Sequence, residues 1–193
     1  MTRPQPVLHA PWRERYLRAL AAGGEGASPG KDSTGCFLRD YWLAPRQDEA
    51  NHVIVRRADD AADAPDAPTG GMVLLNLYPY ANGHLLVALG DGRARLLDYA
   101  PAQRAALWRL VEDAAAILSR ALSPQGVNIG VNEGAAAGAG VPGHLHVHLV
   151  PRWHGDVNFM TVVGGVRVHP SAPERVAAMC REAWGEIASS ARG

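Results

Sequence analysis

Three histidines at alternate positions constrain the fold of this chain more than any other feature. His144, His146 and His148 are separated by single aliphatic residues within the run 143–153. In an extended strand successive side chains point to opposite faces, so the three imidazoles are expected to share one face. A solvated face that is rich in histidine by chance is the less favoured interpretation, because histidine has no preference for strands. The pattern predicts a strand with a chemically active face.

Length and charge narrow the class of protein. The 193 residues suffice for one domain with its own core, and 19 basic residues balance 19 acidic ones. A net charge of zero gives no overall field to attract nucleic acid or an anionic membrane, so neither is expected as a partner. Two cysteines, Cys36 and Cys180, exclude a disulfide framework and suit a reducing compartment. No stretch has the length of a membrane span, and we expect a cytoplasmic protein.

The first third of the chain contains few strong signals. Residues 1–35 are expected to form an N-terminal arm, with a short amphipathic helix at 12–22 and a connector at 23–35. Residues 52–56 predict a short strand. Residues 58–71 are mostly Ala, Asp, Pro, Thr and Gly, which favours an exposed loop. The whole chain, residues 1–193, is expected to form a single domain.

The remainder of the chain alternates between strand and helix patterns. Apolar runs at 72–77 and 84–89 flank the turn residues Asn82 and Gly83 and should pair as antiparallel strands. The most regular helical pattern covers 101–122. Further expected elements are strands at 126–131 and 159–168, the histidine strand and a helix at 173–187. Together they predict an α+β fold with a mainly antiparallel sheet, one long central helix and a C-terminal helix.

A strand face lined by histidines admits two explanations, of which the first is a metal site. Zinc would require three ligands with an open position, or a complete set of four. Cys36 is the nearest candidate for a further ligand, but Cys36-Phe-Leu-Arg39 offers one thiol only. A lone cysteine is more often a small buried hydrophobic residue, and we expect this of Cys36. A metal site is therefore the second choice.

In the second explanation a neutral imidazole attacks phosphorus or an acyl carbon, and a covalent intermediate divides the displacement into two easier steps. A neighbouring histidine supplies a proton or positive charge. Phosphoryl and nucleotidyl transfer depend mainly on positioning and on donors aimed at the phosphate oxygens. The small residues of 134–140, directly before the histidines, can bring backbone N–H groups close to a phosphate, although a flexible connector explains them equally well.

Two separated motifs resemble the histidine triad superfamily of nucleotide hydrolases and transferases. They are the run His144-Leu-His-Val-His-Leu-Val150 and the upstream run Asn76-Leu-Tyr-Pro-Tyr-Ala-Asn-Gly-His84-Leu-Leu-Val87. More narrowly, Asn128-Ile-Gly-Val-Asn132 and Pro151-Arg-Trp-His-Gly-Asp-Val-Asn-Phe159 resemble the branch that contains the bacterial diadenosine tetraphosphate phosphorylases. The likeness extends over residues 8–170 and is weakest across 58–71.

The resemblance implies a role for each of four histidines. His146 would attack the α-phosphorus and form a nucleotidyl-histidine intermediate, with its second ring nitrogen held by a backbone carbonyl. His148 would donate to the phosphate or to the leaving group. His144 and His84 would support the site by hydrogen bonding. The covalent step needs no metal ion, and no cofactor is expected.

Four further positions would bind the substrate. The resemblance places a ribose-binding residue at Asn76, for which an ordinary polar residue at a strand end is the alternative. It places phosphate contacts at Asn132 and at the backbone near Gly140. Trp153 could meet a base or a partner surface, and ordinary packing explains this tryptophan equally well.

The chain departs from the family pattern at two points. Many members carry a second cysteine at the position of Arg39 and a further histidine near Asp91, and with the first triad histidine these bind structural zinc; bound zinc is not expected here. Members also place Gln, Ser or Thr shortly before the nucleophile, where this chain has Gly140 and Val141. Without that side-chain donor the choice between phosphorolysis and hydrolysis stays open.

The sequence therefore predicts a nucleotidyl hydrolase or transferase that cleaves dinucleoside polyphosphates of the diadenosine tetraphosphate type, with water or inorganic phosphate as the acceptor. A nucleoside phosphoramidase and a nucleotide-binding regulatory protein with weak turnover are the alternatives, and a three-histidine metalloprotein is a third. The resemblance also implies a homodimer or a higher homo-oligomer.

Overall fold

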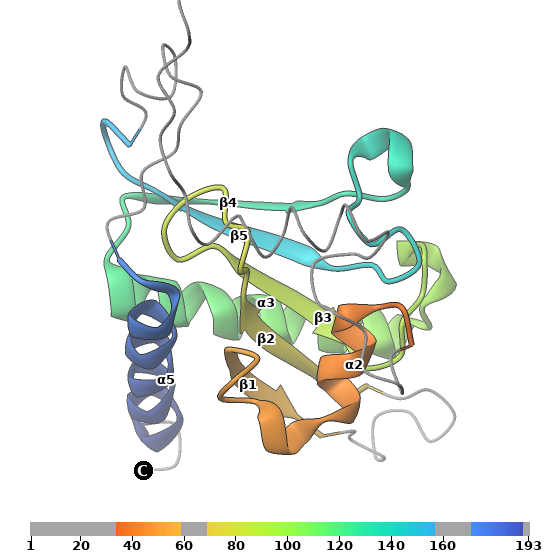
Figure 1. Ribbon diagram of the computed structural model, residues 1–193, viewed down its shortest axis with the longest axis horizontal. Coiled ribbons are helices and arrows are strands. Elements are labelled where there is room, and N and C mark those ends of the chain that lie inside the picture. Colours follow the sequence, from red (N-terminus) through yellow and green to blue (C-terminus); the bar gives the residue numbers. More distant parts are fainter. Residues whose placement is uncertain (1–33, 59–68, 157–170, 191–193) are drawn as a thin grey trace, which may run out of the picture.

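An antiparallel sheet organises residues 34–58, 69–156 and 171–190, which the computed structural model describes (Figure 1). Its strands lie in the order β1-β2-β3-β5-β4, and every neighbouring pair is antiparallel. Their bounds are Val53–Arg57 (β1), Gly71–Leu75 (β2), Leu85–Leu89 (β3), Gly126–Val131 (β4) and Val147–Arg152 (β5). The strands β2 and β3 are buried along their whole length, as their unbroken apolar sequences require.

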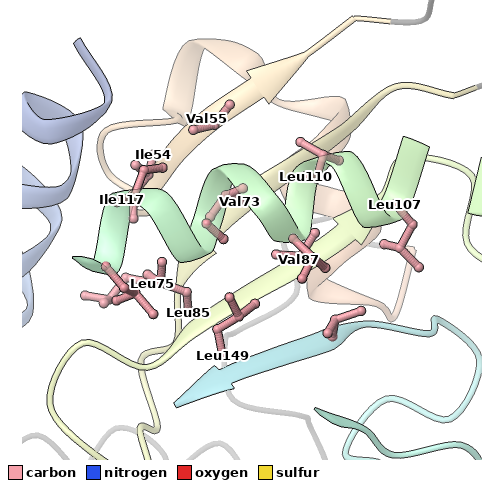
Figure 2. Packing of buried hydrophobic residues seen from close by; sticks show 14 of the residues in the cluster. Ile54, Val55, Val73, Leu75, Leu85, Val87, Leu107, Leu110, Ile117 and Leu149 are labelled. Atoms are coloured by element: carbon pink, nitrogen blue, oxygen red, sulfur yellow. The ribbon is translucent and has the colours of Figure 1, made fainter. Parts of the chain in front are cut away.

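The long helix α3 (Pro101–Leu122) covers one face of the sheet (Figures 1 and 2). Its apolar residues recur at intervals of three and four, so one stripe of the helix faces the strands. The helix is capped by Ser123, whose φ of 45° places it in the left-handed region. The helix α5 (Pro173–Ser190) packs beside α3 and against β1. The main core between sheet and helices includes Val73, Val87, Leu107, Leu110, Ile117 and Leu149.

A short helix, α2 (Phe37–Leu43), covers part of the other face. It forms a second, smaller core with strands β1, β2 and β3, in which the buried residues are Leu38, Val53, Met72, Leu74, Leu86 and Ala88. Within the described residues this core takes no residue from β4 or β5. Because Leu86 pairs with His148, the histidine lies on the same face as this core and directly beside it.

Three short 3-10 helices join these elements. They are η1 (Pro45–Gln47), which follows α2, η2 (Leu96–Asp98), which precedes α3, and η3 (Ala135–Ala137), which lies between β4 and β5. The last of these belongs to the small-residue loop that the sequence places directly before the histidines.

The predicted fold class is confirmed. The helix at 101–122 and the strand at 126–131 have the predicted bounds, because both patterns are long and regular. The two apolar runs pair as antiparallel β2 and β3, and the C-terminal helix continues to Ser190. Along 34–58, 69–156 and 171–190, no helix is long and apolar enough to cross a membrane.

The histidine strand needs a correction. β5 begins at Val147, so His144 and His146 lie in the irregular segment that enters the strand and only His148 lies within it. Leu145 donates its backbone N–H to Arg93 O at 2.7 Å, so this segment is held by the loop after β3 instead of by a strand ladder.

Two further expectations change in the first half of the chain. The exposed loop at 58–71 ends earlier, since Thr69 is buried and Gly71 already begins β2. α2 was not predicted as a helix, because seven residues are too few to display a helical period. The helix expected at 12–22, the strand expected at 159–168 and most of the arm at 1–35 lie outside the described residues.

Candidate active site

Four histidines form a row along β3 and β5. His84 directly precedes β3, and His148 pairs with Leu86 inside the sheet. The ring centroids of His84 and His148 are 5.1 Å apart, and those of His148 and His146 are 4.8 Å apart. His144 follows at the other end of the row, beside the end of β3. The antiparallel pairing of two strands thus brings together histidines that are more than sixty residues apart in sequence, as the separation of 64 between His84 and His148 illustrates.

The orientation of His146 is fixed by the backbone. Its Nδ1 lies 2.9 Å from the carbonyl oxygen of His144, which can only accept, so Nδ1 carries the proton and donates. A neutral His146 therefore presents the lone pair of Nε2. The residue is 95% buried, since its exposed fraction is 5%. A buried imidazole with a free lone pair on Nε2 is suited to attack an electrophile placed against it.

The orientation of His148 is fixed through His84. Tyr80 donates its backbone N–H to Nδ1 of His84 at 3.1 Å, so this nitrogen has the lone pair and the proton of His84 is on Nε2. Nε2 of His84 then donates to Nδ1 of His148 at 3.0 Å. Neutral His148 consequently carries its own proton on Nε2. The two central histidines thus present opposite chemistry, a lone pair on His146 and an N–H on His148.

His144 lies behind this pair and is enclosed. Its Nε2 donates to Leu89 O at 2.8 Å, so its Nδ1 accepts from the thiol of Cys36 at 3.3 Å. Gly92 lies against the ring, and a Cβ at Gly92 would be 2.8 Å from Nδ1. His144 therefore acts on the site through its backbone carbonyl, which holds His146. Cys36 is half-buried at the start of α2, where it packs against the smaller core and its thiol also touches His144. The expectation of a small buried hydrophobic residue is therefore met only in part.

Burial keeps these imidazoles uncharged. It lowers the pKa of His146 and of His144 below the ordinary value of 6.5, and it lowers the pKa of His148 to about 4. Charge repulsion between the imidazolium forms of His146 and His148 lowers the pKa of His148 further. All three rings are therefore neutral near pH 7, which is the state that the tautomer assignments above require.

The neighbouring strand β4 leaves room beside the histidines. Gly130 pairs with His148 and Asn128 pairs with Val150, so these small or amide side chains share the face of His148. Both are exposed. Asn132 follows β4 directly, next to the last pair of the β4–β5 ladder. A substrate that reaches His146 and His148 would thus lie along β4 with little steric hindrance from it.

The loop between β4 and the histidines has a defined conformation. Gly134 and Gly138 have φ values of 82° and 86°, which glycine adopts without strain. Glu133 accepts a hydrogen bond from Leu96 N at 2.9 Å, which fastens the loop to η2. Gly140 is exposed, and a Cβ there would have no neighbour within 4 Å. Backbone N–H groups in such a loop can be approached closely by an anion.

Trp153 lies away from the histidine row. It follows the end of β5, and a strand rise of about 3.3 Å per residue puts it roughly 17 Å along the chain from His148. Arg152 beside it donates to both carboxylate oxygens of Asp156, at 2.6 and 2.9 Å, and to Asn128 Oδ1 at 3.2 Å. Of the sequence-predicted site residues, the structure brings Asn76 and the four histidines into one contact network, but not Trp153.

Sequence reasoning missed the groups that orient the histidines. These are Tyr80 N, Leu89 O, Gly92 and the thiol of Cys36. Three of the four act through the backbone or through the absence of a side chain, so residue type carries no signal for them. The sequence does carry a signal for the turn at Asn76-Leu-Tyr78, because Asn at the end of a strand often accepts a hydrogen bond from the N–H two residues later.

The five-stranded sheet and the histidine row are the arrangement that a histidine triad protein is expected to have. Residues 70–155 match the family model described as the HIT domain. A solved structure described as a zinc-bound histidine triad family protein from Mycobacterium smegmatis superposes with a TM-score of 0.53 at 28% identity. It covers 67% of this chain and 94% of that one.

Two curated relatives carry more specific names. The chain is 42% identical over 97 residues to "AP-4-A phosphorylase" of Mycobacterium tuberculosis, which is 50% of this chain and 50% of that protein. It is 35% identical over 82 residues to "Bis(5'-nucleosyl)-tetraphosphatase [asymmetrical]" of Schizosaccharomyces pombe, which is 42% of this chain and 44% of that protein. The aligned part therefore spans about half the length of these relatives.

The zinc site that many family members have does not fit these residues. Cys36 and His144 are in contact, but Arg39 occupies the sequence position of the second thiol and its guanidinium donates to Gly90 O. Asp91 is already bound to Arg93 and Gln103. In the part of the chain that the structure describes, no three His, Cys, Asp or Glu side chains are placed to hold an ion. A cation such as Arg39 also repels a metal ion.

Proposed function

We propose that this chain cleaves dinucleoside polyphosphates by transferring a nucleoside monophosphate group to His146 and then to water or inorganic phosphate. The observation that carries the proposal is the pair of opposite tautomers, in which His146 presents a lone pair on Nε2 and His148, 4.8 Å away between ring centroids, presents an N–H. The names of the two curated relatives, which refer to AP-4-A and to bis(5'-nucleosyl)-tetraphosphate, support this substrate class.

In the first step Nε2 of His146 forms a bond to the α-phosphorus, and the bond from phosphorus to the bridging oxygen breaks. The leaving polyphosphate departs with the electron pair of that bond. His146 then holds phosphorus on Nε2 and a proton on Nδ1, so it is positively charged and its Nδ1–H bond to His144 O becomes charge-assisted. The N–H on Nε2 of His148 donates to a phosphate oxygen or to the leaving oxygen.

In the second step an oxygen of water or of inorganic phosphate attacks the same phosphorus. The bond between phosphorus and Nε2 breaks, the electron pair returns to His146 and the acceptor loses its proton to solvent. The backbone N–H groups near Gly140 and the amide of Asn132 are proposed to bind the phosphates, because both belong to the connection that leads from β4 to the histidines. A homodimer or higher homo-oligomer and a cytoplasmic location remain predictions.

The test is analysis of the products formed from diadenosine tetraphosphate, with and without inorganic phosphate. ATP and ADP that form only with phosphate mean phosphorolysis, and AMP and ATP that form in water alone mean hydrolysis. We expect His146→Asn to abolish turnover, and we expect a nucleotidyl group on His146 after the reaction is quenched in base, where a phosphorus–nitrogen bond survives. His154→Asn is the matched control, because this exposed histidine lies beyond the end of β5.

Turnover by His146→Asn at the rate of the unchanged protein would refute the assignment of the nucleophile. Release of an amine from a nucleoside phosphoramidate, with no cleavage of diadenosine tetraphosphate, would favour a phosphoramidase. Tight AMP binding with no turnover of either substrate would favour a nucleotide-binding regulatory protein.

A further inference from the structure

The side chain of Asn76 makes two hydrogen bonds at the end of β2, next to the histidine row. Its Oδ1 accepts from the backbone N–H of Tyr78 at 2.9 Å. Because the amide oxygen is thereby identified, the other amide atom, Nδ2, is the one that lies 3.1 Å from Nδ1 of His84. The backbone supports the arrangement, since Asn76 N donates to His84 O at 2.9 Å. Asn76 therefore directs an N–H donor at one particular nitrogen of His84.

His84 thus receives two N–H donors at the same ring nitrogen. The amide of Asn76 and the backbone N–H of Tyr80 both lie 3.1 Å from Nδ1. A protonated Nδ1 would face these two N–H donors, and the ring is fully buried, so water could not offset the cost of that form. The proton of His84 is accordingly held on Nε2.

The tautomer of His84 determines which nitrogen of His148 carries a proton. Nε2 of His84 donates to Nδ1 of His148 at 3.0 Å, and this leaves the proton of neutral His148 on its Nε2. We infer that Asn76 is a positioning residue, which fixes the tautomer of His84 and thereby keeps the Nε2–H of His148 directed at the substrate. The inference rests on the proposed function for its catalytic part, but the tautomer itself is a property of the protein without substrate.

This role differs from the ribose contact that the family resemblance implies for Asn76. A ribose-binding residue acts mainly on substrate affinity, whereas a residue that orients His148 acts on the chemical step. The two roles therefore predict different kinetics for the same substitutions.

Asn76→Asp is the variant of choice. A carboxylate has the same shape and can still accept from Tyr78 N, so the turn is kept, but its second oxygen accepts where Nδ2 donated. That oxygen favours a proton on Nδ1 of His84. Asn76→Ser is the second variant, because its hydroxyl can accept from Tyr78 N but is too short to reach His84. Gln125→Glu, whose side-chain oxygen accepts from His154 N beyond the end of β5, is the matched control for the amide-to-carboxylate change.

The first measurement is the ¹⁵N NMR spectrum of protein labelled in histidine, recorded without substrate. In the unchanged protein we expect an unprotonated Nδ1 and a protonated Nε2 for His84, with the signals assigned by their loss in His84→Gln. In Asn76→Asp the unprotonated Nδ1 signal of His84 should disappear, while in Gln125→Glu it should remain. The same unprotonated Nδ1 signal in Asn76→Asp as in the unchanged protein would overturn the inference.

The second measurement is turnover of diadenosine tetraphosphate. Positioning of a proton donor predicts that kcat falls about 10- to 100-fold in Asn76→Asp and Asn76→Ser with little change in KM. A rise in KM with an unchanged kcat would overturn the positioning role and favour ribose binding. Absence of turnover in the unchanged protein, with the expected ¹⁵N pattern, would refute the proposed function and leave the tautomer assignment standing.

Discussion

At the scale of single residues, the site depends on which nitrogen of each imidazole carries a proton. His84 and His144 use both ring nitrogens in contacts with other parts of the protein. Within the described residues, His146 and His148 use Nδ1 only, and each leaves Nε2 for a substrate. The outer histidines thus orient the inner ones. A substitution that moves an outer ring should therefore lower both the stability of the protein and its turnover.

Gly92→Ala tests whether the position of the outer ring of His144 affects the inner ring of His146. The new methyl group would lie 2.8 Å from Nδ1 of His144, a ring that Leu89 O and Cys36 hold in place. We expect a loss of about 1–3 kcal/mol in the free energy of unfolding from this overpacking. We also expect turnover to fall roughly 100-fold, because His144 O holds Nδ1 of His146 and a small misplacement of a reacting group is costly.

Urea denaturation and product formation from diadenosine tetraphosphate measure the two effects. Gly126→Ala is the matched control, since a Cβ there would meet nothing within 4 Å. Equal stability and turnover in both variants would contradict the enclosure of His144.

At the scale of elements, α3 supplies most of the support beneath the site. Its inward side chains Leu107, Leu110 and Ile117 are almost completely buried against the sheet (Figure 2). His148 lies on the opposite face of the sheet, because it alternates with the core residue Leu149 along β5. Each inward side chain of α3 contributes roughly 1.5–3 kcal/mol through burial. The outward Trp108 remains 45% exposed. The stability of the sheet should thus depend on one stripe of α3 only.

Leu110→Ala should lower the free energy of unfolding by about 2–5 kcal/mol, because it removes buried methyl groups and leaves a cavity at the sheet. Trp108→Ala, on the exposed side of the same helix, should change it by roughly 0.5 kcal/mol or less. Both values follow from urea denaturation. A larger loss for Trp108→Ala than for Leu110→Ala would show that the helix faces the sheet differently.

At the scale of the whole molecule, uncharged histidines buried in the folded state link stability to pH. The pKa values of His144, His146 and His148 are all lowered in the folded protein relative to the ordinary 6.5. Above pH 6.5 both folded and unfolded chains hold these rings neutral, so the full stability is present. Below pH 6.5 the unfolded chain takes up protons that the folded protein does not, and unfolding is favoured.

We therefore expect the free energy of unfolding to fall as pH decreases from 6.5 towards 4, by at most about 1.4 kcal/mol per pH unit for each histidine. His148→Gln should flatten this slope, because the pKa of His148 is lowered to about 4 and its contribution extends over the whole interval. Urea denaturation at several pH values provides the slope. His154→Gln, at an exposed histidine, serves as control, and the same slope in both variants would contradict the prediction.

The long and regular patterns of the sequence predicted most of the fold. The helix at 101–122 and the strand at 126–131 could be read directly, because side-chain periodicity over a full element reports which face is buried. The helix α2 could not be predicted in this way, because its position depends on contacts with Arg56 of β1. The guanidinium of Arg56 binds Asp48 and the carbonyls of Tyr41 and Trp42, and no local sequence pattern indicates these contacts.

The sequence by itself determined which residues gather at the site: the alternating histidines and the motif from Asn76 to His84. Residue type and spacing were sufficient for that, although only His148 of the three alternating histidines lies within a strand. Only the tertiary structure decided what each ring nitrogen does. His144 takes its partners from Leu89, 55 residues away, and from Cys36, 108 residues away. The proton on an imidazole follows the partner of its other nitrogen, and that partner is chosen by folding.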